Sequence, residues 1–390
     1  MPDVEFVNLF AVAAIALGAP LVLAMLPAVR IPAVVLEIVA GIVVGPSVLG
    51  WVHPDLPVQI VALLGLAFLL FLAGLEIDVH RLRGGTLRLA LLGYAVTLGL
   101  GVLAGLGFGT AGWVHSPLLV AITLSATSLG LVVPVLKDAG QAGGALGQAV
   151  IAACSVADFA AVVLLSVLFS SAGAGGGARV VLLVMFVVLV AVTGLVVSVV
   201  GRSRRLETAL TRLQDSTAEI RVRAAVALLI AFVALAEAFG LESILGAFLA
   251  GAVVGLLDQD TASHPRFRAK LEAIGYGFLI PVFFVASGLR LDLSELLANP
   301  AALARVPLFL AALLLVRGVP ALLYWKTFGA RSTVAAALLQ ATSLPFVVTA
   351  TQIGVATGLL TQVTAAALVC AGLLSVLLFP AGALGLLRRA

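Results

Sequence analysis

Charged residues are scarce in this chain of 390 residues: they make up 10% of it, against 63% hydrophobic residues. A soluble protein has roughly 25% charged residues, so the composition excludes an ordinary soluble domain. Cysteine is rarer still. Cys154 and Cys370 both lie inside apolar segments, which argues against a disulfide framework. The basic residues are scattered in short loops, so the net charge of +4 does not indicate a nucleic-acid partner.

The chain has instead a series of long apolar segments. Runs of roughly 17–25 apolar residues have the length of a helix that crosses a bilayer, whereas the strands of a membrane barrel would alternate every second residue. We therefore predict an all-α polytopic membrane protein with about thirteen transmembrane helices. They are expected at residues 6–26, 32–50, 58–75, 88–108, 117–136, 145–170, 180–200, 222–239, 241–257, 273–289, 303–325, 333–353 and 361–385.

Basic residues also predict the orientation. An odd number of helices places the termini on opposite sides, and Arg388 and Arg389 place the C-terminus inside. Most of the 22 Lys and Arg residues then fall in inside loops, including the arginine-rich link 201–223. We expect a protein of the cell (inner) membrane with its N-terminus outside. The acidic N-terminus does not resemble the basic start of a signal peptide, so the first segment is expected to be retained.

Asp158 is the one charged residue in an apolar run of about 25 residues. A carboxylate at that depth is costly by a few kcal/mol, so it is expected to face a partner, a water-filled cavity or a transported ion. The alternative is a neutral, hydrogen-bonded structural aspartate. Glu37, in the second predicted helix, and Ser155, in the same run as Asp158, are further candidates for lining a cavity.

Two predicted helices share a short motif. Residues 124–133 and 339–348 agree at seven of ten positions at an offset of 215, and the shared polar pairs are Thr127-Ser128 and Thr342-Ser343. In the predicted topology the two copies run antiparallel, which is typical of the inverted repeats of secondary transporters. We expect two broken helices that cross near Asp158, with hydroxyl and carbonyl oxygens available to a cation. Two unrelated proline-kinked helices are the alternative.

Arg317 is the basic counterpart of Asp158. It lies well inside the segment 303–325, from where its side chain cannot easily extend to the membrane surface. An unpaired buried charge is unfavourable, so Arg317 is expected to pair with Asp158 or with carbonyl groups of the broken helices.

Four further motifs carry a resemblance to a known family: AGIVVGPS at 40–47, FLLFLAGLEID at 68–78, LGAFLAG at 245–251 and PVFFVASGL at 281–289. Together with the Asp158 region they resemble the monovalent cation:proton antiporter superfamily, the Kef-type and sodium/proton exchanger group. The motifs span nearly the whole chain in the family's order.

The resemblance implies an elevator-type antiporter that exchanges Na+ or K+ for protons without a cofactor, and a homodimer in the lipid bilayer. It implies a single transmembrane domain over residues 1–390, with core helices at 88–170 and 303–385 and scaffold helices at 6–75 and 180–289. No soluble regulatory domain is expected. Asp158 would bind the metal cation and the proton. Further ligands would come from Thr127, Ser128, Thr342 and Ser343, and Arg317 would occupy the family's basic position.

Two residues depart from the family's pattern. Ala157 stands where many members have Asp or Asn, and Arg317 stands where electrogenic relatives have Lys. Because guanidinium does not release its proton, Asp158 is the only evident proton carrier, which predicts electroneutral exchange.

Three alternatives remain at this point: a cation channel, a sodium-coupled carrier of an organic anion, and, most remotely, an intramembrane enzyme. The four histidines fall in loops or at helix ends, which leaves no buried Ser/His pair and no histidine-based metal site. We therefore expect a transporter and not an enzyme.

Overall fold

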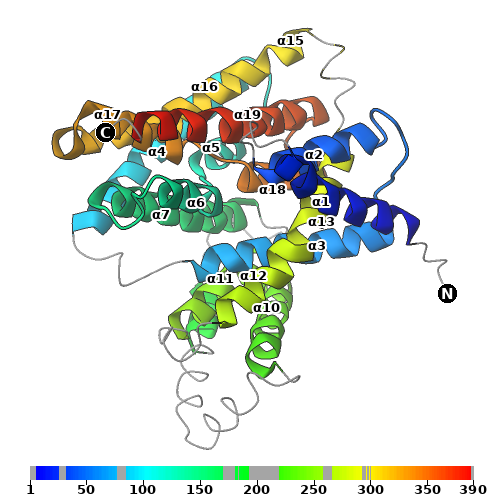
Figure 1. Ribbon diagram of the computed structural model, residues 1–390. Coiled ribbons are helices and arrows are strands. Elements are labelled where there is room, and N and C mark those ends of the chain that lie inside the picture. The colour runs from blue at the N-terminus through cyan, green and yellow to red at the C-terminus, as the bar shows by residue number, and fades with distance from the viewer. Residues whose placement is uncertain are drawn as a thin grey trace, which may run out of the picture. The chain divides into compact units, whose positions relative to one another are not determined.

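The computed structural model describes residues 6–25, 32–76, 85–169, 181–182, 184–192, 219–257, 266–291, 296, 298 and 300–387. All regular structure in this part of the chain is helical (Figure 1). The helices are α1 (Val7–Met25), α2 (Ala33–Val44), α3 (Leu56–Leu75), α4 (Gly85–Thr110), α5 (Pro117–Ser125), α6 (Leu129–Asp138), α7 (Ala145–Phe169), α10 (Ile220–Ala238), α11 (Ser243–Leu257), α12 (Phe267–Ile274), α13 (Ile280–Leu289), α15 (Pro300–Leu303), α16 (Arg305–Gly318), α17 (Trp325–Gln340), α18 (Pro345–Ala356) and α19 (Gln362–Leu387). A π-helical stretch, η1 (Gly275–Leu279), joins α12 to α13, and a 3₁₀ stretch, η2 (Val319–Tyr324), joins α16 to α17.

Seven helical stretches of the described residues are long and apolar enough to cross a membrane. They begin at Val7, Leu56, Gly85, Ala145, Phe267, Arg305 and Gln362. This confirms the all-α polytopic class. About half of the predicted segment 180–200 lies outside the described residues, so the count of thirteen stays a prediction.

The chain divides into two compact units. The first comprises Met1–Ile60, His80–Ala161 and Phe284–Ala390, and the second comprises Val61–Val79 and Val162–Phe283. In the second unit, α10 packs against α11. The predicted division into core and scaffold helices remains a proposal, but all the residues that surround Asp158 below belong to the first unit.

In the first unit, α19 packs along α16 and α17, and α5 packs against α4, α16 and α18 (Figure 1). The contact between α4 and α5 requires glycine at position 105, because a Cβ atom there would lie 2.2 Å from the carbonyl oxygen of Pro117. These neighbours hold the helix pairs α5–α6 and α17–α18 in place.

Both of these helix pairs are interrupted at the shared motif. In the first pair, Ser125 ends α5 and its hydroxyl donates to the carbonyl of Ile122 at 2.8 Å; Ala126 is then extended, with φ −77° and ψ 161°. In the second pair, Pro345 is the first residue of α18, where its missing N–H is tolerated. Pro134 lies inside α6 and not at the first break, so the interruption there comes from the Ala126–Ser128 segment itself.

Candidate functional site

The two breaks contact each other directly. The backbone N–H of Ser128 donates to the carbonyl of Thr342 at 3.0 Å, and the Thr127 hydroxyl donates to the carbonyl of Gln340, the last residue of α17. Each break therefore supplies a partner for a backbone group that the other has lost from its helix. The paired motif predicted this meeting, whereas the internal symmetry of the complete halves stays a prediction.

Asp158 lies beside the first break. It comes from α7, is half-buried, and its carboxylate accepts hydrogen bonds from the backbone N–H groups of Thr127 at 3.1 Å and Leu129 at 3.2 Å. Leu129 is the first residue of α6, so the carboxylate faces the positive end of that helix. Two N–H donors and a helix N-terminus stabilise negative charge on Asp158, while its partial exposure leaves it accessible to a small ion.

Arg317 reaches the same place from the end of α16. Its side chain is 1% exposed. Its Nε donates to the Thr127 hydroxyl at 2.9 Å and to the carbonyl of Gln340 at 3.3 Å, and its Nη1 donates to the hydroxyl of Thr97 at 3.2 Å. Of the two partners expected for Arg317, these contacts show the broken-helix carbonyl.

The remaining predicted hydroxyl ligands are close by but differ in their bonding. Thr342 donates its hydroxyl to the carbonyl of Leu338 at 3.1 Å, inside its own helix turn, and Ser155 does the same toward Ile151 at 2.9 Å. The Ser343 hydroxyl is buried and has no hydrogen-bond partner among the described residues. The structure therefore brings Asp158, Thr127, Ser128, Thr342 and Arg317 into one connected network and places Ser343 next to it.

Glu37 is not part of this network. It lies in α2 and is 4% exposed. No contact in the described residues joins it to Asp158, so its role in a cavity stays a prediction.

Three polar residues in or beside this network were not singled out from the sequence. Thr97 in α4 binds Arg317, and Ser375 in α19 binds both backbone groups of Ser343: it accepts from its N–H at 3.1 Å and donates to its carbonyl at 3.1 Å. The hydroxyl of Tyr94, in α4, lies within hydrogen-bond distance of the Ser125 hydroxyl, at 3.1 Å. A buried polar residue in an apolar helix was the available signal, but many such residues only bond within their own helix.

The described residues contain no group of three or more His, Cys, Asp or Glu side chains that could hold a metal ion. A cation at this site would therefore bind the one carboxylate of Asp158 together with neutral hydroxyl and carbonyl oxygens. Such a mixed, weakly charged set of ligands suits a monovalent ion that must be bound and released again.

Two interrupted helices that meet beside a membrane carboxylate define a secondary ion transporter. The chain matches the family model described as sodium/hydrogen exchanger, transmembrane, over residues 13–386, and it belongs to that family. The resemblance read from the sequence motifs is thereby confirmed.

Two relatives illustrate the relationship. The chain is 33% identical to the putative Na(+)/H(+) antiporter YjbQ of Bacillus subtilis (strain 168) over 339 residues, which cover 83% of this chain and 54% of that protein. It is 30% identical to a Na(+)/H(+) antiporter of Enterococcus hirae over 269 residues, which cover 68% of each chain. This chain thus spans about half the length of the Bacillus protein. Both relatives are named as transporters, in agreement with the expectation of a transporter and not an enzyme.

Among solved structures, the sodium proton antiporter MjNhaP1 from Methanocaldococcus jannaschii is similar in fold. The TM-score is 0.67, the match covers 98% of both chains, and the sequences are 16% identical. This similarity supports the fold class and carries no residue-level argument.

Proposed function

We propose that this protein is a secondary active antiporter that exchanges a monovalent cation, Na+ or K+, for protons, with Asp158 as the carboxylate that binds both. The observation that carries the proposal is the placement of Asp158, half-buried on α7 and held by N–H groups at the start of α6. Both relatives described above are named Na(+)/H(+) antiporters, which supports the exchange of Na+ for protons. Because the chain covers 54% of the first of these relatives, the activity is a proposal for this chain.

The exchange rests on competition for one group. On one side of the membrane the ionised carboxylate of Asp158 binds a partly dehydrated cation, and on the other side a proton displaces it. Either ligand neutralises Asp158. A neutral site crosses the hydrocarbon more readily than an uncompensated charge. Movement of the core with an empty, ionised Asp158 is therefore unfavourable.

The hydroxyl and carbonyl oxygens of the breaks complete the cation site. The Ser343 hydroxyl has no partner among the described residues and is thus free to bind an ion. The Thr127 hydroxyl is engaged in both directions, because it donates to Gln340 and accepts from Arg317. A ligand role for Thr127 therefore requires one of these bonds to open, whereas Ser343 can bind without such a change.

The movement we propose is of the elevator type. The core helices at 88–170 and 303–385 would move against the scaffold helices at 6–75 and 180–289, in a homodimer in the cell inner membrane with the N-terminus outside. Arg317 stays charged throughout the cycle, so one cation is exchanged for one proton and no net charge moves.

The decisive experiment follows proton movement in proteoliposomes that contain a pH-sensitive dye. Adding Na+ or K+ in separate runs should release protons with the wild-type chain. Asp158→Asn should abolish the signal, because an amide neither titrates nor carries the charge that binds the cation. Asp55→Asn is the matched control: Asp55 accepts hydrogen bonds from Asn8 and from the N–H of Val58 at the start of α3, outside the Asp158 network. Full exchange by Asp158→Asn would overturn the proposal.

The same experiment separates the alternatives. A cation channel would conduct ions in this assay without coupled proton movement. A sodium-coupled carrier would move ions only after its organic anion is added. Neither outcome is compatible with cation-driven proton release in the absence of other solutes.

A further inference from the structure

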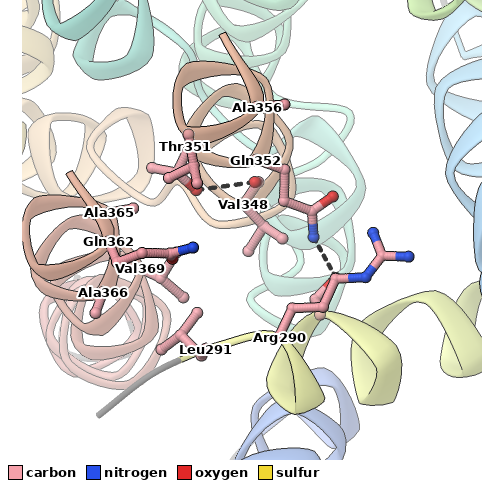
Figure 2. Close-up of a pocket in the computed structure, with 12 residues that line it drawn as sticks. Arg290, Leu291, Val348, Thr351, Gln352, Ala356, Gln362, Ala365, Ala366 and Val369 are labelled. Carbon is pink, nitrogen blue, oxygen red and sulfur yellow. Dashed lines mark hydrogen bonds between the residues drawn. The ribbon is translucent and has the colours of Figure 1, made fainter. Parts of the chain in front are cut away.

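A pocket that does not include Asp158 lies between the ends of α13, α18 and α19 (Figure 2). It has a volume of about 340 Å³, at the lower end of the range for small-ligand sites. Its residues belong to the first compact unit. The pocket lies where the proposed core helices α18 and α19 meet the proposed scaffold helix α13, and none of its residues binds the cation or the proton in the proposed exchange.

The pocket opens where three apolar helices end. Arg290 directly follows the last residue of α13, Ala356 is the last residue of α18, and Gln362 is the first residue of α19. Ends of membrane-spanning helices lie near the level of the lipid head groups. The mouth of the pocket is therefore expected at the membrane surface.

The mouth carries one cationic side chain, that of Arg290. Arg290 is exposed there, yet the surrounding protein still lowers its pKa below the ordinary value through desolvation. None of the twelve described residues that line the pocket is acidic. The first turn of the 26-residue helix α19 adds the positive end of its dipole. This combination favours an anion.

Two amide side chains stand on opposite sides of the pocket. In Figure 2, Gln352 lies on the side of Arg290, and Gln362 lies across from both. The Gln352 Nε2 donates one hydrogen bond to the Ser287 hydroxyl at 3.1 Å, which fixes this side chain between α18 and α13. The second N–H of the same amide is available to a ligand. The Thr351 hydroxyl, in contrast, is used by carbonyls of its own helix. The donors available to a ligand are thus the guanidinium and the two amides.

The inner part of the pocket is apolar. Ala366 and Val369 follow Gln362 on the same face of α19, and Val348 of α18 lies between that face and Arg290 in Figure 2. Val369 follows Gln362 by seven residues, which corresponds to about 10 Å along the helix axis. The apolar wall therefore extends about 10 Å inward from the mouth. A free inorganic ion would gain nothing from such a wall, whereas the chain next to a lipid head group would be buried by it.

We propose that this pocket binds the phosphate-bearing head group of an anionic membrane lipid. The Arg290 guanidinium contacts the phosphate, because its planar set of N–H donors matches the phosphate oxygens. Gln352 and Gln362 donate hydrogen bonds to the head group from opposite sides of the pocket. The apolar wall takes up the adjoining hydrocarbon. Basic pockets between membrane helices are a known means of lipid recognition in general.

The test uses the full chain, stripped of lipid in a neutral detergent. Bound lipid is counted by native mass spectrometry, and the melting temperature is measured during titration with phosphatidylglycerol, with phosphatidylcholine or with inorganic phosphate. Phosphatidylglycerol should bind and raise the melting temperature, while phosphatidylcholine and inorganic phosphate should not. Arg290→Gln should weaken phosphatidylglycerol binding about tenfold, because it removes one charge-assisted contact.

A second variant of the pocket and two matched controls test whether binding depends on the charge at the mouth. Arg88→Gln removes the same charge from an exposed position in the first turn of α4 and should leave binding unchanged. Gln362→Glu adds a negative charge at the mouth and should weaken binding without disturbing the fold, since Gln362 is exposed; Gln59→Glu, at an exposed position of α3, is its matched control. Equal binding by wild type, Arg290→Gln and Gln362→Glu would overturn the proposal. If inorganic phosphate raised the melting temperature as much as phosphatidylglycerol does, the ligand would be free phosphate and the proposal of a lipid would be overturned.

Discussion

Asp158 and Arg317 bind the same residue, Thr127, through different groups. The Asp158 carboxylate accepts from the Thr127 backbone N–H at 3.1 Å, and the Arg317 Nε donates to the Thr127 hydroxyl at 2.9 Å. Thr127 thus connects the acidic and the basic group of the membrane interior. A change at either charge reaches the other through the position of this one residue.

Thr127→Val should uncouple the two charges. Valine keeps the shape of threonine but removes the hydroxyl, so that Arg317 loses one acceptor and the carbonyl of Gln340 loses a donor. An unsatisfied buried polar group costs about 1–3 kcal/mol, so we expect a lower melting temperature and a strong loss of exchange. Thr127→Ser retains the hydroxyl and should keep most of the activity. Normal exchange and stability in Thr127→Val would show that the connection is dispensable.

The sequence predicted which residues form this site better than it predicted the contacts between them. The repeated Thr-Ser pair indicated that the two breaks would meet, and the lone charges in apolar runs pointed to Asp158 and Arg317. The prediction of Asp158 and Arg317 depends on the high energy of charged groups in hydrocarbon. A lone charge in an apolar run can be recognised in a single sequence.

The broken-helix carbonyl that binds Arg317 was expected, but its other partner, the hydroxyl of Thr97, could not be predicted in the same way. Thr97 is one of many polar residues in the apolar segments, and whether it reaches the guanidinium depends on how α4 and α16 are rotated against each other. The same holds for Ser375, because its contact with Ser343 depends on the packing of α19 against the second break. Helix rotation follows from side-chain packing, which periodicity does not determine in helices that are apolar on all sides.

Ser375→Ala tests the support of the second break. Ser375 bonds to the N–H and the carbonyl of Ser343, and a Cβ atom at the neighbouring Gly372 would lie 3.0 Å from that carbonyl, so the contact is tight. Removing the hydroxyl leaves the Ser343 backbone without this partner. We expect the KM for the cation to rise several-fold and stability to fall by about 1–3 kcal/mol.

The control for this variant is Thr110→Val, which removes a hydroxyl that bonds only to the carbonyl of Gly107 in its own helix. Both variants are compared by initial exchange rates over a range of cation concentrations and by thermal unfolding. A Ser375→Ala chain with the wild-type KM would show that the second break holds its shape without α19.

Competition at Asp158 predicts a defined pH dependence of cation affinity. Below the pKa of the carboxylate, protons occupy the site, so the apparent KM for Na+ or K+ should rise about tenfold for each unit of pH decrease. Above that pKa the KM should become constant. The maximum rate should change less, because saturating cation displaces the proton. An apparent KM that is independent of pH from the acidic to the alkaline range would mean that the two ions bind at different groups.

Electroneutral exchange follows from the permanent charge of Arg317. If Asp158 alone exchanges its ligands, the core carries the same charge in both directions, and the membrane potential does no work on the cycle. A membrane potential set with a gradient of a permeant anion such as thiocyanate, which the site does not bind, should therefore leave the initial rate of Na+-driven proton movement unchanged. The control is an electrogenic antiporter reconstituted in the same vesicles, whose rate must respond. A rate that rises with the imposed potential would require a second titrating group, and Glu37, buried in α2 outside the Asp158 network, is the first residue to replace by Gln in that case.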